Sequence, residues 1–145
     1  MKYPILLALL LVIASAMGAC GQATPSPTAA PVVEDQASLL AGLQAAGATT
    51  EIGDTVVQDF FTPEGQSVKV NGQDVQVFEY ETSEAMENEA SQVAPDGGSV
   101  GTSMMMWMDA PHFYKAGRII ILYIGSDANI LNLLEKVIGP QFAGR

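Results

Sequence analysis

Three methionines and one histidine form the most suggestive chemical set in the sequence. Met104, Met106 and Met108 occupy alternate positions, and His112 follows shortly after them. In an extended strand the three methionines share one face, and the residues between them share the other. Thioethers are soft ligands that suit Cu(I), and imidazole also binds copper. The pattern indicates a Cu(I) site made of these four side chains.

The segment from residue 104 to residue 112 is similar to the metal-binding segments of periplasmic copper chaperones, in which a tryptophan lies against an ion bound by methionine and histidine. Trp107 would take that position here, although His112 follows the methionines and the order differs. A second interpretation is that methionines fill irregular gaps in the core and contact aromatic rings. We favour this core interpretation and keep Cu(I) binding as the alternative.

His112 also has an acidic neighbour in the sequence. Asp109 could orient the imidazole for general-base catalysis, but no serine or free thiol stands nearby to be activated. A hydrolase is therefore a distant alternative, and we predict no catalytic residue and no cofactor.

The amino terminus carries a pattern typical of export. Lys2 precedes an unbroken apolar run, Ile5 to Ala14, and small residues follow up to a single cysteine. The tetrad Met17-Gly18-Ala19-Cys20 resembles the lipobox of bacterial lipoproteins, with methionine where leucine is usual. The resemblance implies that residues 1–19 are a signal peptide and that Cys20 is acylated. It also implies a location in the cell envelope, on the extracytoplasmic face of a bacterial membrane.

Two other interpretations of this terminus remain open. Ala14-Ser15-Ala16 fits an ordinary secretory cleavage site, and the uncharged run from Tyr3 to Ala19 reaches the lower edge of spanning length. After Cys20 the chain is rich in proline and small polar residues, as expected either of an extended tether or of a plain disordered spacer of shorter reach. We therefore divide the chain into a signal peptide (1–19), a lipidated tether (20–33) and one globular domain (34–145).

Charge and composition exclude several classes of protein. The chain has 145 residues with 16 acidic and 6 basic side chains, a net charge of −10, which argues against binding to nucleic acid. One cysteine excludes a disulfide framework and a four-thiolate zinc site. Such acidity favours a basic protein partner in the envelope, with contacts expected at the loop tips Asn71-Gly72 and 97–101.

Helical periodicity predicts three helices. Asp35 can cap the first, whose apolar stripe runs from Leu39 to Ala46. The second begins near Ser83 and extends its apolar face to Val93 before Pro95 stops it. The third begins after Asp127 and ends at Gly139-Pro140.

The strand signals are strongest around a tight turn. Residues 67–70 and 74–80 flank Asn71-Gly72, which favours a type I′ hairpin. Residues 104–108 and 118–124 are the other strong candidates, and the second of these is apolar enough for the middle of a sheet. Weaker extended segments are 55–61 and 112–115.

These elements predict an α+β fold in which an antiparallel sheet of about four to six strands carries three helices, mainly on one face. The domain resembles the small uncharacterised domains found behind lipoprotein signals. Its predicted function is that of a non-catalytic binding or accessory module anchored through Cys20, with its ligand undetermined.

Overall fold

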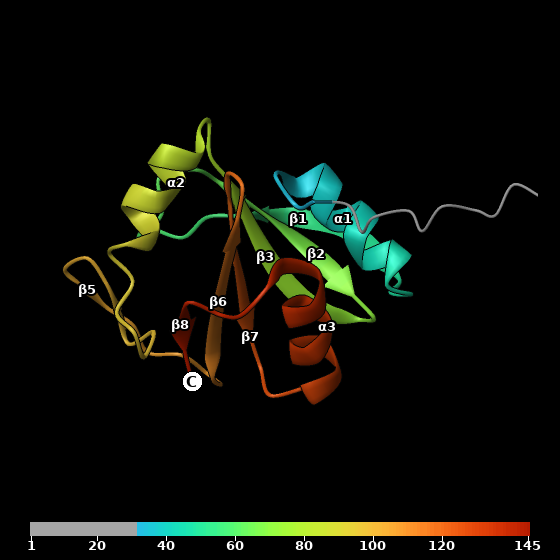
Figure 1. Ribbon diagram of the computed structural model, residues 1–145. Helices are drawn as coiled ribbons and strands as arrows, with labels where there is room; N and C mark the ends of the chain where they lie inside the picture. Colours follow the sequence, from blue (N-terminus) through green and yellow to red (C-terminus); the bar gives the residue numbers. More distant parts are fainter. Residues whose placement is uncertain (1–31) are drawn as a thin grey trace, which may run out of the picture.

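The computed structural model describes residues 32–145 (Figure 1). The predicted signal peptide, Cys20 and all of the tether before Val32 lie outside these described residues. The elements in chain order are α1 (Gln36–Ala45), β1 (Thr50–Val56), β2 (Gly65–Val70), β3 (Gln73–Glu79), α2 (Ser83–Ala90), β4 (Ser99–Val100), β5 (Ser103–Met104), β6 (Pro111–Ala116), β7 (Ile119–Ile124), α3 (Ala128–Ile138) and β8 (Ala143–Gly144).

One antiparallel sheet organises the domain. Its six strands lie in the order β1-β2-β3-β7-β6-β8, and β4 and β5 form a separate two-stranded sheet. The apolar strand β7 lies between β3 and β6, as its composition predicts. The α+β fold class and the antiparallel sheet are therefore confirmed.

The predicted hairpin is present with its expected turn. Val70 and Gln73 are paired across Asn71 and Gly72, whose φ angles are 50° and 85°. Positive φ at both central residues defines a type I′ turn, which matches the twist of the strands it joins. Local chemistry alone thus specifies the β2–β3 register.

The helix boundaries follow their caps. Asp35 accepts a hydrogen bond from the Ser38 amide and begins α1, and Asp127 accepts from the Asn129 amide and begins α3. The helix α2 begins at Ser83 as predicted but ends at Ala90, because the chain turns there and Val93 pairs with Val100 in a β-bridge.

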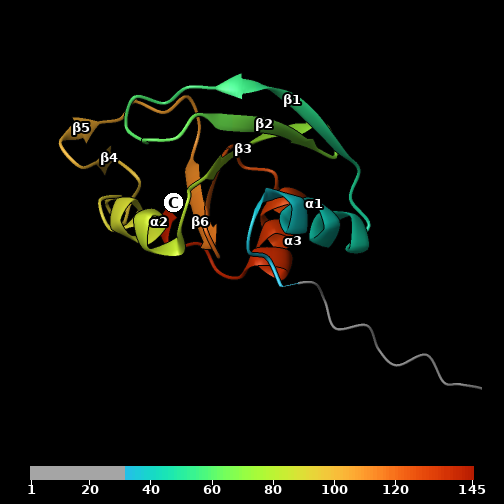
Figure 2. The same cartoon turned by 90° about the horizontal axis from the view of Figure 1, so that it is seen from above.

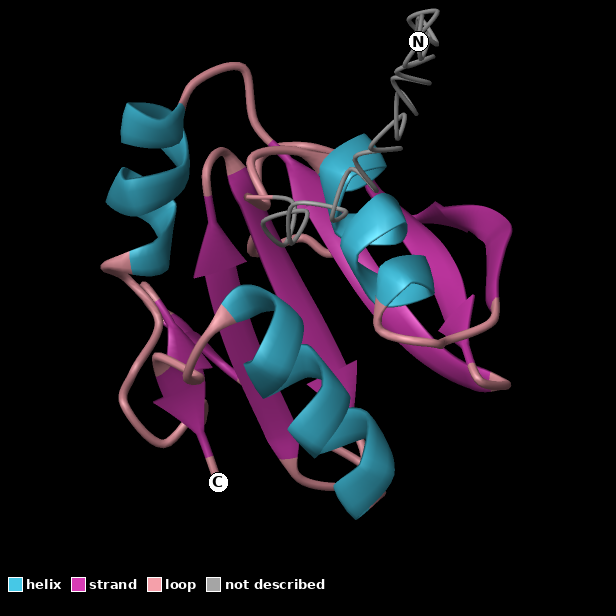
Figure 3. Ribbon diagram, turned by 45° about the vertical axis from the view of Figure 1, so that its right-hand side comes forward, coloured by secondary structure: helices cyan, strands magenta, loops and turns pink. Residues whose placement is uncertain are grey.

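Helices cover both faces of the sheet. Two of the three, α1 and α3, lie together on one face, and α2 packs on the opposite face (Figures 2 and 3). The first face buries side chains of α1 and α3 against alternate strand residues, including Leu39, Leu134 and Ile121. The second buries α2 and the connecting segments against the opposite residues, including Met86 and Phe78. The central strands are therefore apolar on both sides.

Two strand predictions are wrong in position. The extended segment expected at 55–61 is instead β1, Thr50–Val56, which is largely exposed and has no apolar alternation to mark it. The strand expected at 104–108 is reduced to Ser103–Met104, because only those residues pair with β4.

The edge strand β1 is irregular. Its pairing with β2 shifts between Ile52 and Thr55, which is a bulge. Ile52 is exposed, as are Glu51 and Asp54 beside it. In the described part of the chain, no helix is long and apolar enough to cross a membrane.

Candidate functional site

The candidate site is a loop that holds the methionines of the Cu(I) hypothesis. We call residues 101–110 the methionine loop; it begins in the β4–β5 hairpin and ends at β6. Its first half is fixed by backbone hydrogen bonds, from the Gly101 amide to the Gln92 carbonyl at 2.9 Å and from the Met105 amide to the Gly98 carbonyl at 3.0 Å. The loop is therefore attached to the domain by its main chain.

Trp107 attaches the loop through a side chain. Its indole Nε1 donates to the Gly97 carbonyl at 2.7 Å, and its ring meets Phe60 and Phe113 edge-on, with centroids 5.9 Å away in each case. Gly97, expected at an exposed loop tip, is buried, and a Cβ there would lie 3.0 Å from Pro111. The hairpin thus packs against the second core face.

The three alternate methionines point into solvent. Met104, Met106 and Met108 are 88, 99 and 103% exposed, whereas Met105 and Trp107 are partly buried. The alternation expected of extended backbone is present, although only the first of these residues is in a strand. The interpretation of the methionines as core-filling side chains is wrong, because the residues between them supply the contacts with the core.

His112 is separated from the methionines. It is 5% exposed in β6, with Nδ1 2.7 Å from the Gln141 Oε1 and the ring stacked on Tyr123. It lines a hollow of about 350 Å³ together with Glu135 of α3. A different hollow of about 380 Å³ is lined by Met106 and other loop residues. Met106 and His112, two of the proposed copper ligands, therefore line separate hollows.

Asp109 does not orient the histidine. Its Oδ1 accepts from the Ala110 amide at 2.7 Å and from the Ser126 hydroxyl at 2.8 Å. These hydrogen bonds lower the pKa of the Asp109 carboxyl, the one from Ala110 most strongly. The carboxylate therefore connects the end of the methionine loop to the segment before α3, and the imidazole pairs with Gln141 instead.

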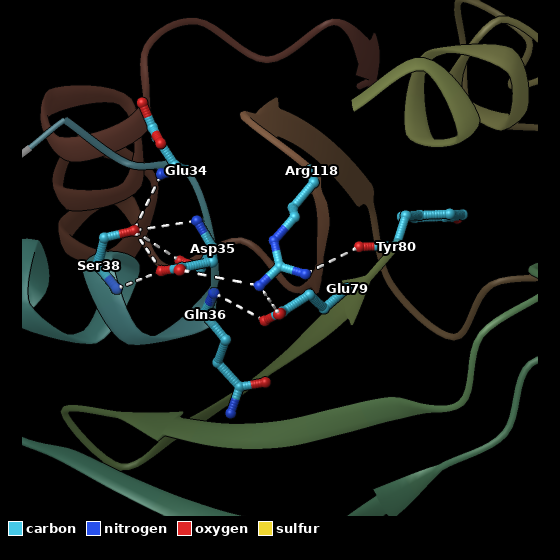
Figure 4. A network of polar contacts seen from close by, with 7 residues as sticks. All are labelled: Glu34, Asp35, Gln36, Ser38, Glu79, Tyr80 and Arg118. Carbon is cyan, nitrogen blue, oxygen red and sulfur yellow. Dashed lines mark hydrogen bonds and ion pairs between the residues drawn. The ribbon is translucent and has the colours of Figure 1, made fainter. Parts of the chain in front are cut away.

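A second polar cluster surrounds Arg118 (Figure 4). One guanidinium nitrogen lies 2.6 Å from the Glu79 carboxylate and 3.9 Å from that of Asp35, and the other donates to the Tyr80 carbonyl at 3.3 Å. Glu79 also accepts from the Gln36 amide at 3.0 Å. Arg118 thus ties the start of α1 to β3, and its donors are directed at protein acceptors, so we interpret the cluster as structural.

The same cluster fixes the first described residues. The Arg118 amide donates to the Glu34 carbonyl at 2.8 Å, and Val33 is buried in the core. Gly117 permits this approach, since its φ is +52° and a Cβ would lie 2.2 Å from the Glu34 Cα. Asp35 then caps α1, and the pKa of its carboxyl is lowered mainly by its hydrogen bond with the Ser38 hydroxyl.

Glutamates of the acidic stretch between β3 and the end of α2 are partly used in internal contacts. The Tyr80 hydroxyl donates to Glu89 at 2.8 Å, and burial together with this carboxylate raises the pKa of Tyr80. Lys115 pairs with Glu87. Within residues 32–145, no group of three or more His, Cys, Asp or Glu side chains could hold a metal ion.

Comparisons with protein-family models, with curated proteins and with solved structures found no match. The geometry of the methionine loop and the residue pattern of the amino terminus are therefore the features of this protein that bear on its function.

Proposed function

We propose that this protein is a lipid-anchored, extracytoplasmic binding module without catalytic activity, whose contact surface is the methionine loop. The observation that carries the proposal is the high exposure of Met104, Met106 and Met108 on a loop whose backbone is held in place. The anchor is acylated Cys20, and its support is the lipobox-like tetrad that ends at this residue.

Exposed methionines suit a binding surface because they gain free energy when a partner covers them. Burial of one such side chain contributes about 1.5–3 kcal/mol, so three contribute roughly 5 kcal/mol or more before the costs of association. Methionine is unbranched and polarizable, and it adapts to partners of different shape. Trp107 limits the entropy lost on binding, because its hydrogen bond to Gly97 already fixes the loop.

The position of the loop agrees with attachment at the amino terminus. The described chain begins beside α1, and β5 lies at the end of the domain farther from α1 (Figures 1 and 2). In a module anchored through Cys20, the methionine loop would therefore lie at the end of the domain away from the point where the tether joins it.

The charge of the protein favours a basic partner. All 16 acidic residues follow Cys20, whereas Lys2 belongs to the predicted signal peptide, so processing makes the net charge of −10 more negative by one unit. Several basic side chains are already paired, among them Lys69 with Asp74 and Lys115 with Glu87. A basic protein with an apolar patch would match the net charge of the chain and the exposed methionines.

Two experiments test the anchor and the surface separately. Mass spectrometry of the mature amino terminus should find an acylated residue at Cys20, and Cys20→Ala should move the protein from the membrane fraction to the soluble fraction. An unmodified cysteine in the mature chain, or wild-type protein in the soluble fraction, would refute the anchor.

For the surface, a photo-reactive amino acid is placed at position 106 and, as a matched control, at exposed Ala41 on α1. Position 106 should give a discrete cross-linked product in cells that position 41 does not. Met104→Glu with Met108→Glu should abolish that product, whereas leucine at the same two positions should preserve it. Identical products from positions 106 and 41, or a product that persists in the glutamate variant, would contradict the proposed surface.

Cu(I) binding is a second candidate function, favoured by the exposure of three thioethers at alternate positions. The ligand set is then Met104, Met106 and Met108, because His112 is buried beside Gln141. Titration of the purified protein with Cu(I) under reducing conditions tests this candidate. His112→Asn should leave the affinity unchanged, and leucine at the three methionine positions should remove it. Binding that survives the leucine substitutions would exclude these thioethers as the site.

A further inference from the structure

We infer that Met104, Met106 and Met108 form a modification site for peroxides, and that their conversion to methionine sulfoxide weakens binding at the methionine loop. The second part rests on the proposed function, since it concerns the same contact surface. The reactivity of the three methionines is tested without a partner.

The reaction needs only a thioether that a peroxide can reach. A sulfur lone pair attacks one peroxide oxygen, the S–O bond forms and the O–O bond breaks, and the second oxygen leaves and takes up a proton to give water or an alcohol. The sulfur is oxidised by two electrons and the peroxide is reduced by two. Because susceptibility follows exposure, the three solvent-facing methionines should react first.

A fourth methionine provides an internal comparison. Met86 in α2 is 2% exposed and packs in the second core face with Phe78 and Tyr80. A peroxide reaches this sulfur only when the structure opens locally, which limits its rate of oxidation. Among the described residues there are therefore one protected thioether at Met86, three accessible ones, and a half-buried one at Met105.

The loop is built so that oxidation of these methionines leaves the fold intact. Trp107 makes the aromatic contacts of the loop, and Asp109 connects its end to Ser126. The three exposed side chains place a new sulfoxide oxygen in water, where it is hydrated at no cost to packing. A sulfoxide at Met86 would instead place an unpaired polar group in the core.

Oxidation changes the contact surface because a sulfoxide is polar. A partner that covers it must remove water from the new S=O group, and the apolar burial that favoured binding is reduced. Three such changes on one loop should weaken binding at least about tenfold. The change is reversible, since the two methionine sulfoxide reductases each act on one sulfoxide epimer.

The reactivity is tested by treating the purified protein with hydrogen peroxide for increasing times and measuring each methionine by peptide mass spectrometry. Oxidation of Met104, Met106 and Met108 should proceed within about threefold of its rate in the urea-unfolded chain, whereas Met86 should be at least about 100-fold slower than when unfolded. The thermal midpoint of the triply oxidised protein should equal that of the untreated protein. Equal rates at Met86 and Met106, or a lowered thermal midpoint, would overturn the inference.

The effect on binding is tested with the photo-reactive probe moved from position 106 to Ala110, at the end of the loop, so that all three methionines stay in place. Peroxide treatment should remove the cross-linked product, and the two reductases should restore it. The matched variant with leucine at 104, 106 and 108 should give a product that peroxide does not affect. If peroxide removes the product in the leucine variant, or if the product persists after oxidation of the wild type, control of binding by methionine oxidation is refuted. Either result leaves the proposed contact surface in place.

Discussion

Gly117 and Gly72 offer a matched test of how the first described residues are held. Both glycines have positive φ, +52° and +85°, and both lie in hairpin turns. They differ in their surroundings, because a Cβ at Gly72 meets nothing within 4 Å, whereas one at Gly117 would lie 2.2 Å from the Glu34 Cα. Comparison of Gly117→Ala with Gly72→Ala therefore isolates the contact with Glu34 from the cost of backbone strain.

The structure permits an estimate of the difference. Positive φ costs a non-glycine residue about 1–2 kcal/mol in either variant. In Gly117→Ala the new methyl group must displace Glu34, which breaks the 2.8 Å hydrogen bond from the Arg118 amide, worth about 1 kcal/mol. Displacement also withdraws Val33 from the core, at about 1.5 kcal/mol. Gly117→Ala should thus lower the free energy of unfolding by about 4 kcal/mol and Gly72→Ala by about 1.5 kcal/mol.

Urea unfolding of the two purified variants and the wild type measures both values, and the slope of the transition shows whether the unfolding reaction is unchanged. Equal destabilisation by the two substitutions would refute the reasoning, because it would mean that residues 33–35 contribute nothing through their contact with the β6–β7 turn.

Other predictions concern the core and the pH dependence of stability. Leu134→Ala removes a fully buried side chain and should lower the unfolding free energy by about 3 kcal/mol in urea. Because burial and Glu89 raise the pKa of Tyr80, the free energy of unfolding should decrease above about pH 10, where the Tyr80 phenol ionises in the unfolded chain. Tyr80→Phe should make this decrease smaller in unfolding experiments at alkaline pH. Because Ser38 lowers the pKa of Asp35, the Asp35 carboxylate stabilises the fold above about pH 4, and this contribution is lost as pH falls through the lowered pKa. Asp35→Asn keeps a capping oxygen and should therefore reduce the loss of stability at acid pH, measured by urea unfolding. An unchanged loss of stability in this variant would contradict the role given to Asp35.

Features of the fold that depend on local chemistry were predictable. The caps at Asp35 and Asp127 and the turn at Asn71-Gly72 each act within a few residues, and all three are confirmed. The position of β1 was not predictable, because this exposed edge strand has no apolar pattern. Its bounds are determined by pairing with β2. The two-residue strand β8 depends in the same way on its partner β6.

The candidate site was predictable in part. Alternation between Met104 and Met108 indicated two faces, and the structure confirms which residues share each face. The composition of the segment could not show which of the two faces is buried. The buried face is determined by the contacts of Trp107 with Phe60, which is distant in sequence, and with Phe113. The partner of His112 is likewise non-local, since Gln141 lies 29 residues away.

The irregular edge of β1 limits how neighbouring copies of the protein can associate. A regular edge strand offers a continuous row of free amide and carbonyl groups to a strand of another molecule. Here the bulge after Ile52 interrupts that row, and the charges of Glu51 and Asp54 repel the same edge of a second copy. Crowded copies of the protein would therefore stay separate instead of growing into a shared intermolecular sheet.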